Sequence, residues 1–213
     1  LAVQAAAILG DMTPSNASAS LTIFAADHGI AAQRVSAFPQ EVTGQMVANF
    51  LAGGAAANVI AAQFDIPVTV VDCGIAHPPR RRDGLIDLSL GGGTADSSTG
   101  PAMSPETARK AIAQGRHFAC GIESKIVCFG EMGIANTSAA ALLAHKLSGI
   151  SVAELVGRGT GLDDTALSHK QDVLERAAAR TGALAPIEAL ADLGGFEIGT
   201  MAGAMVGAGA SNK

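Results

Sequence analysis

Residues 126–137, IVCFGEMGIANT, place a carboxylate and a glycine turn where an apolar run gives way to an Ala/Leu-rich segment. The apolar run is typical of a β-strand, Glu131 follows it, and residues 138–147 have the composition of a helix. Because the first N–H groups of a helix are unpaired and its dipole favours negative charge, the turn is predicted to be an anion site. Gly133 would let the backbone approach a ligand, and Asn136 is expected to cap the helix.

Glu131 has two interpretations at this point. A carboxylate at the end of a buried strand, beside a site that attracts phosphate, is either a catalytic or sugar-binding group or a capping residue. The residues of this stretch do not separate the two. Convergence of other segments on the same place would favour the functional interpretation.

A second glycine-rich loop, residues 157–161 (GRGTG), precedes a predicted helix that extends to about Arg180. It does not match the dinucleotide-binding fingerprint, because the third glycine comes one residue too early and no strand immediately precedes the loop. Asp163 is expected to cap the helix. Lys170 follows on the same helical face, about 10 Å along the axis at 1.5 Å per residue, and its ammonium could reach an anion near the loop. The alternative is an exposed, solvated lysine.

Two further predicted strands, residues 21–26 and 68–71, are apolar apart from one threonine each and end in the triplets DHG and DCG. Buried parallel strands have this composition, and α/β sheets place ligand-contacting groups at the carboxyl ends of their strands. We therefore expect both triplets to face one crevice. His28, in the first triplet, could act as a base, but a structural role beside the strand end is favoured.

Strands that alternate with helices predict an α/β fold with a mostly parallel sheet flanked by helices. Ser104 has the position of an N-cap before Pro105, and Gly199, Gly203 and Gly207 recur at a four-residue spacing that predicts close helix packing. The remaining expected elements are helices at residues 2–9, from 39, at 55–62 and from 186, a turn at 13–16, and a short strand at 85–90.

The composition fits one sizeable domain: the chain has 213 residues, 48% hydrophobic and 15% charged, with seven Phe and neither Trp nor Tyr. Small and aliphatic residues of this kind suit close packing of helices on a sheet. The net charge of −5 provides no basic field for nucleic acid. The basic run at residues 80–82 follows two prolines and is predicted to be a solvated loop.

Cys73, Cys120 and Cys128 lack the spacing of metal ligands, so neither a disulfide framework nor a zinc site is indicated. We expect a reducing, cytoplasmic setting and no metal. Residues 198–210 are interpreted as the only long weakly polar stretch, too short and glycine-rich to cross a membrane. No secretory signal is found, but the chain begins at Leu1 without methionine and ends after a glycine-rich run, so we expect it to be part of a longer protein.

Six segments together resemble the nicotinate-nucleotide:dimethylbenzimidazole phosphoribosyltransferase family of cobalamin synthesis. They occur in collinear order from about Ala25 to the C-terminus, which makes the resemblance far more specific than a single glycine-rich loop. The segments are AADHGIAAQRVSAFPQEVTGQMVANFLAGGAAANV, VVDCGI, GPAMSPETARKAI, GEMGIANTSAAAL, VGRGTGLDD with the downstream SHK, and LGGFEIGTMAGAM.

The resemblance implies transfer of a phosphoribosyl group from nicotinate mononucleotide to 5,6-dimethylbenzimidazole, which releases nicotinate and forms α-ribazole 5′-phosphate. The reaction as written needs no cofactor. The resemblance also implies a homodimer whose subunits have a Rossmann-like large domain and a small domain built from both chain ends. Residues 1–213 would then be a single large α/β domain, with terminal segments belonging to an incomplete small domain.

The resemblance also implies a role for each matching position. The loop that holds the nucleotide phosphate is matched by Met132, Gly133, Ile134, Ala135, Asn136 and Thr137. Its further phosphate contacts are matched by Gly159 and Lys170, and a substrate-site acid is matched by Glu131. The wall of the benzimidazole pocket is matched by Ser36, Phe38 and Gln45.

The general-base glutamate of the family lies in a C-terminal segment that this chain does not reach, so the base is not assigned. One alternative is therefore a catalytically incomplete module for nucleotide-phosphate binding and dimerisation. Another, a nucleotide-dependent oxidoreductase of Rossmann type, is disfavoured because the dinucleotide fingerprint is absent.

Overall fold

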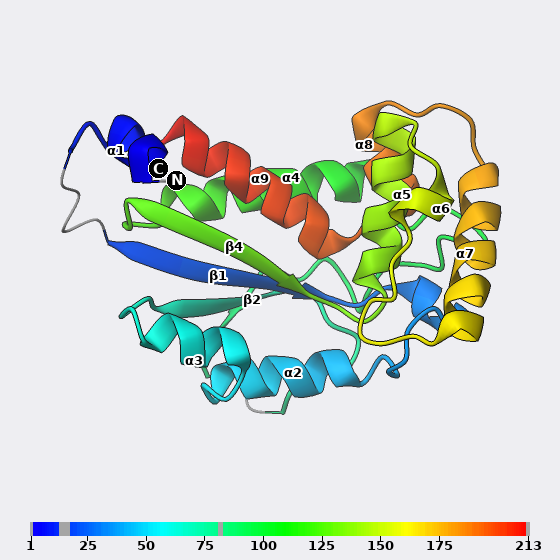
Figure 1. Ribbon diagram of the computed structural model, residues 1–213, viewed down its shortest axis with the longest axis horizontal. Coiled ribbons are helices and arrows are strands. Elements are labelled where there is room, and N and C mark those ends of the chain that lie inside the picture. Colours follow the sequence, from blue (N-terminus) through cyan, green and yellow to red (C-terminus); the bar gives the residue numbers. More distant parts are fainter. Residues whose placement is uncertain (1, 13–17, 81–82, 212–213) are drawn as a thin grey trace.

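The described residues form a parallel four-stranded sheet with helices on both faces (Figure 1). The structure is a computed structural model and describes residues 2–12, 18–80 and 83–211. In spatial order the strands are β3 (Leu85–Asp87), β2 (Val68–Gly74), β1 (Ala19–Ala26) and β4 (Ile126–Met132), and each neighbouring pair is parallel. The predicted α/β fold with a mostly parallel sheet is confirmed.

Helices cover both faces of the sheet, and a further group lies at one end of it. Helix α9 (Phe196–Ala210) packs on the sheet with α4 (Pro105–Cys120) against it, and α2 (Val42–Leu51) contacts the strands from the other face. The other helices are α1 (Ala2–Leu9), α3 (Ala56–Ala62), α5 (Asn136–Ser148), α6 (Val152–Leu155), α7 (Asp164–Ala179), α8 (Pro186–Leu193) and a 3₁₀ helix at Gly29–Gln33. In Figure 1, α5 to α8 gather beyond the carboxyl ends of the strands.

Phe24 anchors the core between the sheet and α4. Its side chain is fully buried in β1, and its ring meets the ring of Phe118 edge-on, with 5.8 Å between centroids, and that of Phe129 at 5.9 Å. Residues 22–26 of β1 and 70–74 of β2 are all buried, as expected of strands covered on both faces. The carboxyl ends of these strands are therefore held rigidly where the polar triplets begin.

Glycines let α4 and α9 pack backbone against backbone. A Cβ atom at Gly203 would clash with the carbonyl oxygen of Ile112, and a Cβ atom at Gly207 would lie 2.5 Å from the carbonyl oxygen of Arg116. Side chains larger than hydrogen cannot be placed there without moving one helix. The packing role predicted from the four-residue spacing is confirmed at both positions.

Two predicted helix starts are wrong. Asn136 does not cap α5 but is its first residue; the N-cap is Ala135, which has a φ of 72° and makes no side-chain cap. The helix expected from residue 39 begins at Val42, because the chain first makes a turn in which the N–H of Val42 donates to the carbonyl of Pro39 at 3.1 Å. Turn geometry therefore sets both boundaries.

Other local predictions have mixed outcomes. Ser104 and Asp163 cap α4 and α7 as expected, each accepting a backbone N–H three residues on. The strand expected at residues 85–90 ends at Asp87, whose carboxylate accepts the N–H of Ser89 at 3.0 Å and turns the chain. The turn expected at residues 13–16 lies outside the described residues. So do positions 81 and 82 of the basic run.

The predictions from the sequence overlooked one long apolar stretch, Val42–Ala62. Within the described part of the chain, Val42–Ala62 is long and apolar enough to cross a membrane by length and composition, and 17% of its most apolar window is buried. It is not one continuous helix, because a turn at residues 52–55 separates α2 from α3. The interpretation of residues 198–210 as the only long weakly polar stretch is therefore wrong.

Replacing Gly203 by Ala should destabilise the protein, because the added methyl group must push α9 away from α4. Overpacking of this kind lowers the free energy of unfolding by about 1–3 kcal/mol, which urea denaturation would measure. Gly209→Ala is a matched control in the same helix, since nothing lies within 4 Å of the new Cβ. It should leave stability unchanged or raise it by up to about 1 kcal/mol, because Ala favours helix over Gly. Equal losses in both variants would contradict the packing role.

Candidate active site

The two glycine turns lie side by side beyond the carboxyl end of β4. A Cβ atom at Gly159 would lie 3.5 Å from Thr137 Oγ1 and 3.8 Å from Lys170 Nζ. A hollow of about 340 Å³ opens at this junction. Its lining comes from three parts of the chain: Val35, Ser36 and Ala37; Glu131, Met132, Gly133, Ile134, Ala135, Asn136 and Thr137; and Arg158, Gly159, Thr160, Leu162 and Lys170.

Lys170 lies at the base of this junction and is not a solvated lysine. Its side chain is 1% exposed, and its Nζ donates to Thr137 Oγ1 at 2.9 Å and to the carbonyl of Gly157 at 3.2 Å. Burial lowers the pKa of Lys170. Since its two partners are neutral, an anion in the hollow would relieve this cost by restoring the charged form.

The backbone of the first turn is partly committed to its own structure. The N–H of Ile134 donates to Thr43 Oγ1 at 3.0 Å, and the N–H of Asn136 donates to the carbonyl of Gly133 at 3.1 Å. These two amides are therefore engaged within the protein. The attraction of the turn for an anion then comes from the dipole of α5, from its other amides and from the ammonium of Lys170.

Gly133 is required where the turn crosses the end of β1. A Cβ atom there would clash with the carbonyl oxygen of Ala26 and would lie 3.3 Å from both Cδ2 and Nε2 of His28. The turn is thus pressed onto the strand end and the imidazole. This contact, rather than a positive φ, explains the glycine.

Glu131 lies at the end of β4, opposite Phe24 of β1, with its side chain at the hollow. It does not cap α5, whose N-cap is Ala135, so the capping interpretation fails for that helix. Glu131 is exposed at the rim of the hollow, but desolvation by the surrounding protein raises its pKa, the carboxylate of Glu197 raises it further, and His28 opposes both. The arrangement puts a carboxylate at one side of the hollow and the Lys170 ammonium at another.

His28 is buried beneath the first turn. Its Nε2 lies 2.7 Å from Glu197 Oε1, and the two side chains are 1% and 0% exposed. Burial lowers the pKa of His28, but the carboxylates of Glu197, Asp27 and Glu131 outweigh it and the net shift is upward. Because His28 does not line the hollow, the favoured interpretation of a structural histidine agrees with the structure better than a base that touches substrate.

The two strand-end triplets lie next to each other, since the N–H of Asp27 donates to the carbonyl of Gly74 at 2.9 Å, but neither lines this hollow, so the expectation that both face one crevice stays a prediction. Their carboxylates hold backbone instead of lining the hollow. Asp27 Oδ2 accepts the N–H of Ala76 at 2.8 Å, and Asp72 Oδ1 accepts those of Gly74 and Ile75 at 2.9 and 3.0 Å. These aspartates therefore shape the loops that follow β1 and β2.

The expected benzimidazole-wall residues are only partly brought together. Ser36 lines the hollow and its Oγ accepts the N–H of Phe38 at 3.3 Å. Phe38, 47% exposed, and Gln45, exposed on α2, do not line it. Sequence reading missed Arg158, whose position inside the glycine loop was a signal, and Thr43, for which no signal existed.

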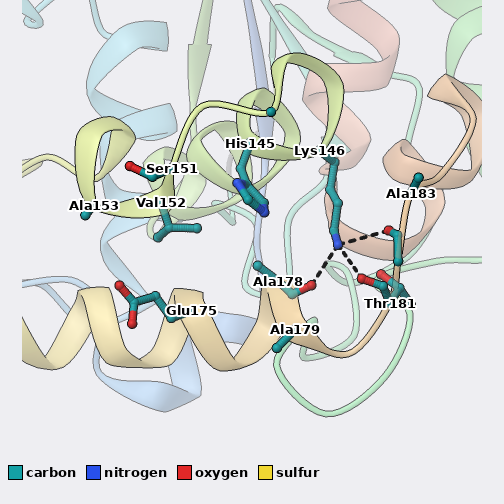
Figure 2. A pocket seen from close by; sticks show the side chains of 12 residues that line it. His145, Lys146, Ser151, Val152, Ala153, Glu175, Ala178, Ala179, Thr181 and Ala183 are labelled. Carbon is teal, nitrogen blue, oxygen red and sulfur yellow. Dashed lines mark hydrogen bonds between the residues drawn. The ribbon is translucent and has the colours of Figure 1, made fainter.

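A larger hollow of about 560 Å³ lies between the ends of α5, α6 and α7 (Figure 2). Figure 2 shows the ammonium of Lys146 bound to main-chain oxygens at the end of α7. Its Nζ donates to the carbonyls of Ala178, Thr181 and Gly182 at 2.7, 2.5 and 3.1 Å. All three ammonium hydrogens are therefore used to cap a helix end, so this hollow is less suited to an anion than the one at Lys170.

Comparison with known proteins places these features in a family. A family model described as phosphoribosyltransferase matches residues 1–213. The chain belongs to this phosphoribosyltransferase family. Similar curated proteins include the nicotinate-nucleotide–dimethylbenzimidazole phosphoribosyltransferases of Aromatoleum aromaticum, 49% identical over 212 residues, and Cupriavidus necator, 48% identical over 217 residues. The resemblance stated from the sequence is confirmed.

The phosphoribosyltransferase relatives are longer than this chain. The two matches cover 98% and 99% of the chain but 62% of each relative. The crystal structure of CobT from Thermus thermophilus superposes with a TM-score of 0.91 at 39% identity, and the match covers 99% of this chain and 65% of that one. The chain thus spans a little under two thirds of these proteins.

Gly133→Ala should distort the first turn, because the new methyl group meets the Ala26 carbonyl and the ring of His28. We expect stability to fall by about 1–3 kcal/mol in urea unfolding and the NMR signals of the His28 imidazole to shift. Gly157→Ala is the control in the facing turn, since its Cβ meets nothing within 4 Å. A Gly133→Ala protein indistinguishable from this control would show that the turn is not pressed onto β1.

Proposed function

We propose that the parent protein transfers the phosphoribosyl group of nicotinate mononucleotide to 5,6-dimethylbenzimidazole, with nicotinate and α-ribazole 5′-phosphate as products. The observation that carries the proposal is the ammonium of Lys170, buried between two glycine turns at one hollow. The names of the similar proteins support the choice of donor and acceptor. We further propose that the parent is a cytoplasmic homodimer and that this chain is mainly its large domain.

In this proposal the phosphate lies at the meeting point of the turns. Charge-assisted hydrogen bonds and helix N-termini suit it, because phosphate is dianionic and accepts several hydrogen bonds. The proposed phosphate contacts are Met132, Gly133, Ile134, Ala135, Asn136, Thr137, Gly159 and Lys170. Glu131 then faces the ribose and the ring, while Ser36, with Phe38 and Gln45 further out, belongs to the acceptor side.

The proposed reaction is a displacement at the anomeric carbon. The lone pair of one acceptor nitrogen forms a bond to that carbon while the bond to the pyridine nitrogen of nicotinate breaks. The electron pair of the broken bond neutralises the cationic ring, and a base accepts the proton from the other acceptor nitrogen. Anchoring the phosphate positions the ribose, which can supply several kcal/mol of the barrier, and base catalysis typically adds roughly 100- to 10,000-fold.

Within this scheme Glu131 stabilises positive charge. Charge accumulates near the anomeric carbon as the bond to nicotinate stretches, and an ionised carboxylate at the edge of the hollow would favour it. We assign no residue of this chain as the base for the acceptor. In this proposal the base belongs to the portion of the relatives that this chain does not span.

The full-length parent, mixed with nicotinate mononucleotide and 5,6-dimethylbenzimidazole, should release nicotinate in step with α-ribazole 5′-phosphate. Chromatography with mass detection would quantify both.

The share of the relatives that the chain lacks favours a second candidate for residues 1–213 alone, a phosphate-binding and dimerisation module. Binding of nicotinate mononucleotide without turnover by residues 1–213 would favour that module, and release of nicotinate by the parent without the coupled product would reject the transfer.

Lys170→Met should weaken binding of nicotinate mononucleotide by about 1.5–3 kcal/mol, the range for a hydrogen bond to a charged group. Methionine keeps the length of the side chain but lacks the ammonium. Isothermal calorimetry on wild type and variant would measure the difference. Lys146→Met, which removes a lysine bound to three carbonyls elsewhere, should lower stability without changing the affinity. Unchanged binding in Lys170→Met would remove this residue from the proposed site.

A further inference from the structure

The buried pair of His28 and Glu197 lies directly behind the first glycine turn. His28 follows β1, and Glu197 is in the first turn of α9, so the pair joins two elements that are 169 residues apart. Glycines give it room from two sides. A Cβ atom at Gly133 would lie 3.3 Å from the ring, and one at Gly195 would lie 2.5 Å from both His28 Cε1 and Glu197 Oε2.

Structural stability alone does not account for this pair. Replacing a buried ion pair by apolar groups of similar volume is often neutral or stabilising, because desolvation offsets much of the attraction. Among the described residues, Glu197 Oε2 is a buried oxygen without a hydrogen-bond partner, which adds to the cost. A carboxylate oxygen 2.7 Å from an imidazole nitrogen favours the protonated form of the ring.

We propose that His28 and Glu197 form a positioning pair, in which a protonated His28 supports the Gly133 turn from behind and keeps Glu131 ionised at the hollow. This inference rests on the proposed function, because it assigns to Glu131 a role as a carboxylate facing the substrate. His28 does not touch the hollow and acts through Glu131 and through the turn.

The surrounding charges agree with this arrangement. The charged groups that face His28 are Glu197 from α9, Asp27 at the end of β1 and Glu131 from β4. Together they raise the pKa of His28 although burial opposes them. His28 in turn lowers the pKa of Glu131, against the effects of desolvation and of Glu197. Removing the charge of His28 would therefore leave Glu131 with two influences that favour its protonated form.

The protonation state of His28 can be measured without any substitution. ¹⁵N NMR of the imidazole in the wild-type protein at neutral pH should show both ring nitrogens protonated. A neutral tautomer would overturn the proposal, whether or not the protein catalyses phosphoribosyl transfer. This measurement also decides the case if a His28 variant fails to fold.

His28→Gln in the full-length parent tests the effect on Glu131. The glutamine amide can still donate a hydrogen bond toward Glu197 but carries no charge. The acid limb of the profile of kcat/KM against pH should move to higher pH, with the loss growing toward roughly tenfold for each pH unit below that limb. Activity should recover at higher pH as Glu131 ionises.

His145→Gln is the matched control, since this histidine bonds the carbonyl of Ile150 at 2.7 Å at the far end of α5. Its profile should equal that of wild type. ¹³C titration of the Glu131 carboxyl, assigned with Glu131→Gln, should show a higher pKa in His28→Gln than in wild type. A uniform loss at every pH, or an unshifted Glu131, would overturn the proposal. Wild-type protein without turnover would count against the proposed function, while the ¹⁵N NMR measurement and the ¹³C titration would still decide the coupling.

Discussion

A cation kept out of water by neutral partners sets the character of this site. The Lys170 ammonium is bound by a hydroxyl and a carbonyl, and removing a charge from water is costly unless a counter-charge replaces the solvent. Lys146 shows the contrasting solution, in which three carbonyls at a helix end use every donor hydrogen. The difference is that Lys170 retains a charge that an incoming anion can neutralise. Both glycine turns are arranged around that charge.

The topology explains why distant segments meet there. All strand pairs are parallel, so the strands deliver their following loops to one edge, and α5 to α8 gather beyond it. β1 lies between β2 and β4, which puts the polar residues after β1 next to the turn after β4. Gly133 can then lie on the end of β1 only because it lacks a side chain. Sheet order and one small residue together bring the turn, the strand end and the imidazole into contact.

The sequence could predict those parts of the site that are encoded locally. The strand, turn and helix around Glu131 and the cap at Asp163 depend on neighbours within a few residues, and both occur. Asn136 failed as a cap because the left-handed conformation of Ala135 shifts the helix start by a residue. The turn before it is held by Gly133 against Ala26 of β1 and by the N–H of Ile134 on Thr43 of α2, contacts that no local pattern records.

Burial and long-range pairing were beyond sequence reasoning. A lysine on a helix face is usually solvated, and only the packing of the two loops reveals that Lys170 is enclosed. The contact between His28 and Glu197 joins residues that are 169 positions apart. Neither residue has a sequence pattern around it that predicts the contact. The likeness across six segments nevertheless pointed to most of the lining, because collinear motifs carry tertiary information that spacing within one motif does not.

The distribution of charge across the hollow gives the proposed site a direction. The proposed donor has a dianionic phosphate at one end and, at the other, a pyridine ring whose nitrogen is cationic and whose carboxylate is negative. Lys170 and the N-terminus of α5 would attract the phosphate, and the carboxylate of Glu131 would attract the cationic ring nitrogen. A donor bound in reverse would put the dianionic phosphate beside the carboxylate of Glu131, which electrostatics disfavours. Since the whole chain carries a net charge of −5, this polarity comes from local placement and not from an overall field. The pair behind Glu131 matters for the same reason, because a protonated Glu131 would remove one of the two poles.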